Sequence, residues 1–172
     1  HHGWSYHPTE VNEMHPELDF DLMGAQLEAC KEIGVNAPVY ISAGYDEKDY
    51  LRHPEWHCVV SPDKERQKEY ENEVHFHLLC FNTAYLDVLC KQIEEVIVKY
   101  NPCGIFLDII SPKICYCEKC KSDMKALGLN IENEDDREKF SQIVFNKYLE
   151  ATNAAVRKHS ATATIIHNQG HI

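Results

Sequence analysis

Hydrophobic and polar positions alternate along the chain between two periods, one typical of helices and one typical of strands. In residues 16–35, apolar side chains recur every three or four positions from Leu18 to Ile33, which predicts a helix that ends at Gly34. The run "APVYISAG" after it is rich in β-formers and predicts the first strand. The polar stretch 46–73 has two prolines and mixed charge, so we expect an irregular loop of the functional kind there.

The same alternation continues in the second half of the chain. "VHFHLLCFN" predicts a second strand, and Thr83 is expected to cap a helix over residues 84–100 with one apolar face. "CGIFLDII" is apolar up to a single acid, as expected for a third, parallel strand that is buried on both faces. A short helix, an acidic turn, a long helix and a fourth strand at "ATIIHNQ" follow.

Strands and helices in alternation predict an α/β fold with a parallel sheet and right-handed crossovers. Four strands in 172 residues fit either a doubly wound domain or about half of a (β/α)8 TIM-type barrel, which usually takes about 250 residues. The chain begins within a loop, and no closing helix follows its last strand. We therefore expect residues 1–172 to be part of a barrel, with about four parallel strands and their helices, from a longer chain.

Composition narrows the class of partner. The formal net charge of −11 argues against nucleic acid, which needs clustered Lys and Arg, and no apolar run is long enough to span a membrane. The eight cysteines do not form the regular framework of a secreted scaffold. Buried free thiols in a reducing compartment are the better interpretation, which favours a cytoplasmic protein; a homo-oligomer is left open.

Polar and aromatic residues follow the predicted strands. Reactive groups of parallel α/β folds lie at the C-terminal ends of strands, so we expect these residues on one rim. Aromatic rings with imidazoles and amides suit a sugar, because rings contact its apolar face and the polar groups bind hydroxyls. The set comprises His1, His2, Trp4, Tyr6, His7, Tyr40, Ser42, Tyr45, Asp46, Cys80, Asn82, Asp108, His167, Asn168 and His171.

Asp108 is the most specific single candidate. A carboxylate at the end of an apolar strand must be solvated, paired or functional. The alternative is that Asp108 caps the turn that follows it through backbone amides. The pair His1 and His2 is weaker alone, since surface loops and affinity tags contain such pairs, although the following "GWSYHPTE" is unlike a linker.

Three cysteines lie close together in "CYCEKC", at Cys115, Cys117 and Cys120. Three thiolates within six residues can converge on Zn²⁺, which takes four ligands. Cys80 is the preferred fourth ligand if its strand neighbours that of Asp108, with His57 or Cys58 as alternatives and Cys103 a poorer one. The other interpretation is that these thiols are free or partly disulfide-bonded, because the paired C-x-x-C arrangement is absent. An all-thiolate zinc site would be structural and would leave no open position for substrate.

Five blocks in order, "HHGWSYHPTE", "PVYISAGYD", "LLCFNTAYLD", "GIFLDII" with "CYCEKC", and "IIHNQGH", give the chain a family resemblance. Together they resemble the catalytic barrel of the hypothetical glycosyl hydrolase 6 domain, which occurs in α-L-fucosidases of glycoside hydrolase family 151. A more distant similarity links them to the α-L-fucosidases of family 29. The cysteine loop is similar to a zinc-binding loop in β-galactosidases of family 42.

The resemblance implies roles for individual residues. Asp108 would be the nucleophile, His1 and His2 the sugar-binding pair, and Trp4 the nearby aromatic. Tyr40 falls near a sugar-contacting tyrosine, and Gly3 stands where family 29 has an Asp. The resemblance also implies an acidic stretch after "HNQGHI" that carries the general acid/base, so it supplies a nucleophile and no partner for it.

These observations predict a retaining α-L-fucosidase that needs no cofactor for catalysis and holds a structural zinc. Asp46, Glu10 and Glu118 are the candidates within this chain for the second carboxyl, which would lie about 5–5.5 Å from the nucleophile. The alternatives are a zinc-stabilised module without activity, which binds carbohydrate or another subunit, and a hydrolase resembling the β-galactosidases. A metallohydrolase is disfavoured, because the thiolate ligands are soft and closed.

Overall fold

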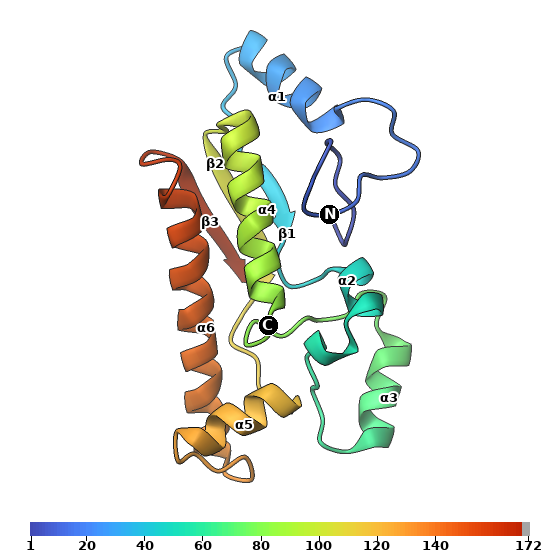
Figure 1. Ribbon diagram of the computed structural model, residues 1–172, viewed down its shortest axis with the longest axis vertical. Helices are drawn as coiled ribbons and strands as arrows, with labels where there is room; N and C mark the ends of the chain where they lie inside the picture. The colour runs from blue at the N-terminus through green and yellow to red at the C-terminus, as the bar shows by residue number, and fades with distance from the viewer. Residues whose placement is uncertain (170–172) are drawn as a thin grey trace.

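The structure, a computed structural model, describes residues 1–169 of the chain. Three parallel strands form its sheet in the order β1 (Val39–Ser42), β2 (Gly104–Ile110) and β3 (Thr164–Gln169), as seen in Figure 1. The α/β fold with parallel strands and crossover helices is therefore confirmed. His171, expected on the rim, lies outside the described residues.

Within residues 1–169, seven helical segments connect and flank the strands. They are α1 (Leu22–Glu32), α2 (Glu47–Arg52), the 3-10 helix η1 (Pro54–Trp56), α3 (Lys64–Glu73), α4 (Tyr85–Tyr100), α5 (Glu118–Ala126) and α6 (Glu134–Arg157). In Figure 1, α4 and α6 lie side by side on the same face of the sheet, and α2, α3 and α5 gather beyond the carboxyl ends of the strands. The crossover helices thus cover one face of the sheet and leave the other free of helices.

The apolar core lies between the sheet and these two crossover helices. Leu89 and Ile93 of α4, Leu107 of β2, and Tyr148 and Val156 of α6 are all completely buried. The opposite face of the sheet carries Tyr40 and Phe106, whose rings stack 5.9 Å apart and remain partly exposed. The third predicted strand was expected to be buried on both faces; within the described residues only its helix-facing side is fully packed.

The segment 74–82, expected as the second of four strands, is not a strand. It forms two isolated antiparallel bridges, from Leu78 to Tyr45 and from Leu79 to His57. Its backbone hydrogen bonds go to the loop beyond β1, with Leu79 N donating to Gly44 O and Cys80 N donating to Trp56 O. β1 pairs directly with β2 instead, so the described residues contain three parallel strands.

The polar stretch expected as an irregular loop contains α2, η1 and α3. Aspartate caps begin both of its α-helices: Asp46 accepts a hydrogen bond from Asp49 N, and Asp63 accepts from Glu65 N and Arg66 N. Capping therefore organises a segment that has too few apolar residues to show helical periodicity. Thr83 also differs from expectation, because Ala84 occupies the cap position of α4.

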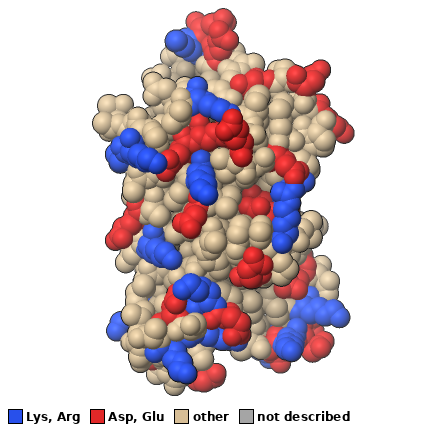
Figure 2. All heavy atoms as spheres, in the orientation of Figure 1, with Lys and Arg blue, Asp and Glu red and all other residues tan. Residues whose placement is uncertain are grey.

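No helix within residues 1–169 is long and apolar enough to cross a membrane. On the face drawn in Figure 2, the Lys and Arg side chains are interspersed with Asp and Glu. Charges of both signs are thus mixed on this face, and the site around Asp108 depends on local hydrogen bonds.

Candidate active site

Three polar side chains meet on the helix-free face of the sheet, near the carboxyl ends of its strands. The register pairs Tyr40 with Phe106 and Ser42 with Asp108, so residues two apart along each strand share a face. Tyr40 comes from β1, Asp108 from β2 and Asn168 from β3. Of the residues expected on one rim, Tyr40 and Asn168 therefore meet at Asp108.

Both oxygens of Asp108 accept hydrogen bonds. Tyr40 donates its hydroxyl to Oδ2 at 2.9 Å, while Asn168 Nδ2 and the Ile109 backbone N donate to Oδ1 at 2.6 and 2.9 Å. Partial burial acts to raise the pKa of Asp108, but these three donors outweigh it, and the pKa lies below its ordinary value. Asp108 is thus held as a carboxylate.

Tyr40 is a donor that stays protonated. Burial first, and then the hydrogen bond to Asp108, raise the pKa of its hydroxyl well above the ordinary value. The Tyr40 ring is 38% exposed and stacks on Phe106, so it presents an apolar surface beside the carboxylate. A polar group next to an open aromatic face is the arrangement expected of a sugar site.

The two N-terminal histidines lie at the same rim. The His1 ring lies 5.5 Å from the Tyr40 ring, and the His2 ring stacks on Phe76 at 4.0 Å. His2 N donates to Ser42 Oγ at 2.7 Å, which anchors the loop to the end of β1. Burial lowers the pKa of His2, so its imidazole is neutral near pH 7 and able to donate or accept a hydrogen bond.

The local structure explains why position 3 is a glycine. Its φ of +97° is a conformation that favours glycine, and a Cβ there would lie 2.8 Å from Lys48 atoms and 2.9 Å from Asp46 Oδ1. Trp4, expected to contact sugar, has the Lys48 ammonium 3.9 Å from the centre of its ring. One face of that indole is therefore occupied by a cation, and a sugar would have to use the other face or displace it.

Two predicted substrate contacts point elsewhere. His167 lies on β3 opposite Leu107, and its imidazole contacts the Tyr148 hydroxyl and Asn153 Oδ1 of α6 on the helix-covered side of the sheet. Asn82 is buried and donates to Asp123 at 2.8 Å and to the sulfur of Cys120 at 3.8 Å. Neither side chain is brought to Asp108, because the first is on the alternate face of its strand and the second belongs to the cysteine cluster.

Four cysteines form a compact, buried cluster beyond β2. The sulfurs of Cys80, Cys115, Cys117 and Cys120 all lie within 4.8 Å of one another. Cys80 Sγ lies 3.5 Å from Cys120 Sγ and 3.9 Å from Cys117 Sγ. Tetrahedral Zn²⁺ with bonds of about 2.3 Å separates its sulfurs by about 3.7 Å, so this donor set fits the metal.

Amide hydrogens next to the sulfurs support the same assignment. Cys117 N donates to Cys115 Sγ at 3.4 Å, and Asn82 donates to Cys120. Such N–H groups stabilise thiolates, the form that a metal requires. Cys58 contacts Cys115 as a fifth thiol, and this hydrogen bond together with burial raises its pKa well above the ordinary value, so it stays protonated. The exposed Cys103 lies outside the cluster.

Comparison with known proteins identifies the family. Residues 1–109, more than half of the chain, match the family described as hypothetical glycosyl hydrolase 6. The chain belongs to this family.

The similarity to a solved structure covers more of this chain than the residues that match the family. α-L-Fucosidase isoenzyme 2 from Paenibacillus thiaminolyticus is 40% identical, with a TM-score of 0.92, over 99% of this chain and 26% of its own. The chain thus spans about a quarter of the length of that relative. No curated protein matches it significantly.

Candidates for a second catalytic carboxyl in this glycosyl hydrolase domain make other contacts. Asp46 is buried at the cap of α2, and burial raises its pKa to about 6. Glu118 begins α5 and pairs with Lys121. Glu10 uses its backbone N to bind Glu95. Asp46 has the raised pKa expected of a general acid, but its carboxylate is engaged by the backbone of α2.

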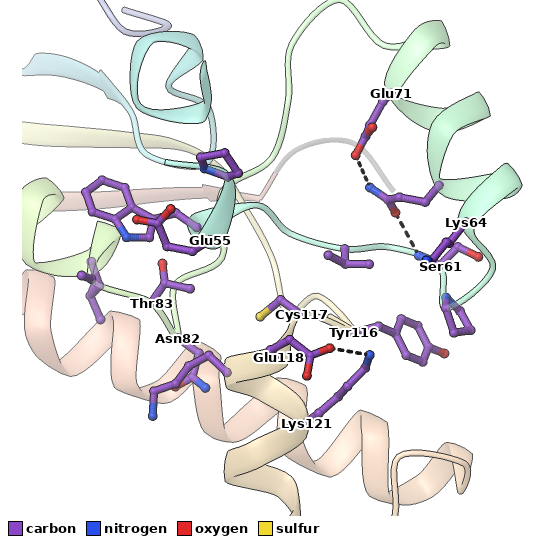
Figure 3. A pocket seen from close by; sticks show the side chains of 18 of the residues that line it. Glu55, Ser61, Lys64, Glu71, Asn82, Thr83, Tyr116, Cys117, Glu118 and Lys121 are labelled. Carbon is purple, nitrogen blue, oxygen red and sulfur yellow. Dashed lines mark hydrogen bonds and ion pairs between the residues drawn. The ribbon is translucent and has the colours of Figure 1, made fainter. Parts of the chain in front are cut away.

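A hollow of about 880 Å³ lies beside the cysteine cluster. In Figure 3, Glu55, Thr83 and Asn82 lie on one side of it and Ser61 and Lys64 on the other. Tyr116, Cys117 and Glu118 lie between these two sides, and Glu71 projects from α3 (Figure 3). Its side chains are mixed in charge, with Glu118 and Lys121 paired, so it does not favour one ligand class.

Sequence reasoning missed the residues that shape the backbone at the site. Ile109 has a φ of +62°, a conformation that a β-branched residue rarely adopts. Gly44 packs against it so closely that a Cβ would lie 2.0 Å from Ile109 O. The glycine at the end of the first strand was a visible signal of close approach, whereas Ile109 carried none.

Proposed function

We propose that the protein is a retaining glycosidase, specifically an α-L-fucosidase, in which Asp108 is the nucleophile. The observation that carries the proposal is an ionised carboxylate on three donors, at the carboxyl end of a parallel strand and on its open face, in a domain of a glycosyl hydrolase family. The preference for fucose rests on the name of the 40%-identical relative.

The reaction would proceed in two displacements. An oxygen of Asp108 attacks the anomeric carbon and forms an ester bond, while the bond from that carbon to the leaving oxygen breaks and a general acid gives that oxygen a proton. Water then attacks the same carbon, loses a proton to the conjugate base, and releases Asp108 and the free sugar.

Neighbouring side chains would hold the sugar during both steps. The neutral His2 imidazole and the His1 ring are placed to bind hydroxyls, and the ring of Tyr40 offers an apolar face. Trp4 would contribute its face opposite Lys48. Hydrogen bonds of this kind accelerate the reaction if they strengthen as positive charge develops on the sugar.

The four-cysteine cluster would hold a structural zinc. Its ligands would be Cys80, Cys115, Cys117 and Cys120, whose sulfurs have tetrahedral spacing and fill the coordination sphere. Zinc would fix the chain that leaves β2 after Asp108, and no step of the reaction involves it. Reduced, buried thiols agree with a reducing compartment, and we keep the cytoplasm as a prediction.

The test is hydrolysis of aryl glycosides by the full-length gene product. The parent should cleave an aryl α-L-fucoside with retention, and Asp108→Gly should lose activity and recover it with azide as a fucosyl azide. Asp123→Gly is the matched control, because that carboxylate pairs with Lys119 on α5, away from the sheet. Full activity in Asp108→Gly would remove the nucleophile, and cleavage of a β-galactoside alone would replace the substrate.

A module that binds carbohydrate without cleaving it is the second candidate. One observation favours it: the carboxylates of Asp46 and Glu118 are engaged by the backbone of α2 and by Lys121, and neither is bonded to a group at Asp108. Isothermal titration with L-fucose separates the two. Binding by a full-length protein that cleaves none of the aryl glycosides would support the module.

A further inference from the structure

The two oxygens of Asp108 have different surroundings. Oδ1 accepts from Asn168 Nδ2 and from the backbone N of Ile109, whereas among residues 1–169 Oδ2 accepts only from the Tyr40 hydroxyl. A carboxylate oxygen has about two lone-pair directions, so both are used on Oδ1 and one remains on Oδ2. The carboxylate therefore presents one engaged oxygen and one that can form a new bond.

We propose that Asn168 is a positioning residue for the nucleophile, which acts with the strained backbone at Ile109 to hold Oδ1 and leave Oδ2 as the attacking oxygen. This inference rests on the proposed function. It gives Asn168 a task other than binding sugar, because its amide already donates to Asp108.

The backbone at Ile109 is held in a costly conformation for this purpose. A left-handed φ of +62° is unfavourable in a non-glycine residue, so surrounding contacts must maintain it. Ala43 N and Gly44 N donate to Asp108 O at 3.0 and 3.4 Å, and Ile109 O lies against Gly44. The resulting turn lets Ile109 N bond the side chain of the residue before it.

The strain coincides with a change in strand pairing. The register between β2 and β3 shifts between Leu107 and Ile110, so Asp108 lies within the irregular part of the ladder. Such irregularities re-aim a side chain at an active site. Here the shift coincides with the Asn168 amide lying at hydrogen-bond distance from the carboxylate at the end of the neighbouring strand.

Tyr40 completes the arrangement. The Tyr40 hydroxyl keeps its proton. As Oδ2 forms the ester bond, this hydroxyl can therefore release Oδ2 and donate to an oxygen of the sugar instead. Asn168 and Ile109 keep their bonds to Oδ1 throughout, which preserves the orientation of the carboxylate in both steps. The charged or titratable groups that act on Asp108 are Tyr40 of β1 and His2 of the N-terminal loop.

The kinetic test uses Asn168→Ala in the full-length protein, with Asn153→Ala as control because that amide lies on α6 and meets His167. We expect kcat to fall about 100-fold, as for a misplacement of about 1 Å, with KM changed less than about threefold. The acid limb of kcat should move to higher pH, since a donor that keeps Asp108 ionised is lost. A raised KM with parental kcat and an unmoved limb would make Asn168 a sugar-binding residue and overturn the proposal.

A structural test identifies the oxygen directly. Trapping the enzyme with a 2-deoxy-2-fluoro-fucosyl fluoride and solving the crystal structure should place the ester on the oxygen opposite Asn168, with the Asn168 bond intact. An ester on the Asn168-bound oxygen would overturn the proposal. Failure of azide to rescue an inactive Asp108→Gly, or full activity of that variant, would instead reject the nucleophile itself, so the two failures are distinguishable.

Discussion

Gly44→Ala tests whether close packing at the end of β1 positions Asp108. An ideal Cβ at Gly44 would lie 2.0 Å from Ile109 O, whereas real Cβ atoms stay at least 3.0 Å from such neighbours. The difference, 3.0 − 2.0, requires a shift of 1.0 Å, and the atom that must move is backbone rather than the flexible end of a side chain. The two hydrogen bonds to Asp108 O would be disturbed with it.

The magnitudes follow from that shift. Overpacking costs about 1–3 kcal/mol, and we expect the upper end because backbone hydrogen bonds are weakened too. At about 2–4 °C per kcal/mol, Tm should fall by about 6–12 °C. Since Ile109 supports Asp108, a displacement of about 1 Å should also lower kcat about 100-fold in the folded fraction.

Gly34→Ala is the matched control for this substitution. Gly34 has a φ of +73° and no atom within 4 Å of an added Cβ, so only conformational strain of about 1 kcal/mol applies. Differential scanning calorimetry gives Tm, and initial rates on an aryl α-L-fucoside give kcat. Parental Tm and kcat in Gly44→Ala would refute the reasoning, as would an equal loss of kcat in Gly34→Ala.

The remaining predictions concern the metal and two ionisable groups. Elemental analysis of the purified protein should give about one zinc per chain. Cys80→Ser should lower this ratio and Cys58→Ser should not, because Cys80 is one of the four proposed ligands and Cys58 is not. Glu95 accepts hydrogen bonds from Thr9, from the Glu10 backbone and from His7. Burial raises the pKa of Glu95, but these bonds outweigh burial and the net pKa is lowered. The ionised Glu95 therefore stabilises the fold fully above pH 4.5, and this stabilisation is lost as the pH falls further. Glu95→Gln should be destabilised by about 2 kcal/mol at pH 7 in urea unfolding and should lose this acid dependence; an acid limb like that of the parent would contradict the assignment. Burial lowers the pKa of His77, but its bonds to Glu47 raise it, and the net shift is upward. Protonated His77 therefore stabilises the fold fully below pH 6.5, and this stabilisation is lost as the pH rises through the folded pKa. His77→Gln should flatten the stability profile in that range, and an unchanged profile would show that His77 does not cause the dependence.

Local pattern was enough to predict the elements with strong periodicity. The helix over residues 84–100 and the strands of "APVYISAG", "CGIFLDII" and "ATIIHNQ" carry continuous apolar signals, and all four are present. The segment 74–82 was misassigned because β-forming residues such as Phe76 and Leu79 pack and bridge within a loop, and the identity of the strand next to β1 depends on tertiary pairing. Propensity does not contain that information.

The sequence identified residues at the centre of the candidate site, but it did not predict the directions in which the side chains point. Asp108 as a candidate, and the group Cys115, Cys117 and Cys120, followed from residue type and spacing. Cys80 was one of several options for a fourth ligand, and only the structure brings it to the other three. His167 and Asn168 are adjacent in sequence and were treated alike, yet successive side chains of a strand point to opposite faces. Only the pairing of β3 with β2 determines that Asn168 faces Asp108 while His167 faces α6.

The position of the thiol cluster follows from the strain at the end of β2. Ile109 and the register shift leave the strand irregular just where it must present Asp108, so the chain that follows has few sheet contacts to hold it. Seven residues beyond Asp108 the chain reaches Cys115, and Tyr116 N donates to Val59 O at 2.7 Å, which ties it to the loop after η1. Cys80 brings the segment before α4 to the same point. A cross-link among these segments would restrain both sides of the strained turn, which would give a mechanical reason for the proposed metal site to lie next to the proposed nucleophile without touching it.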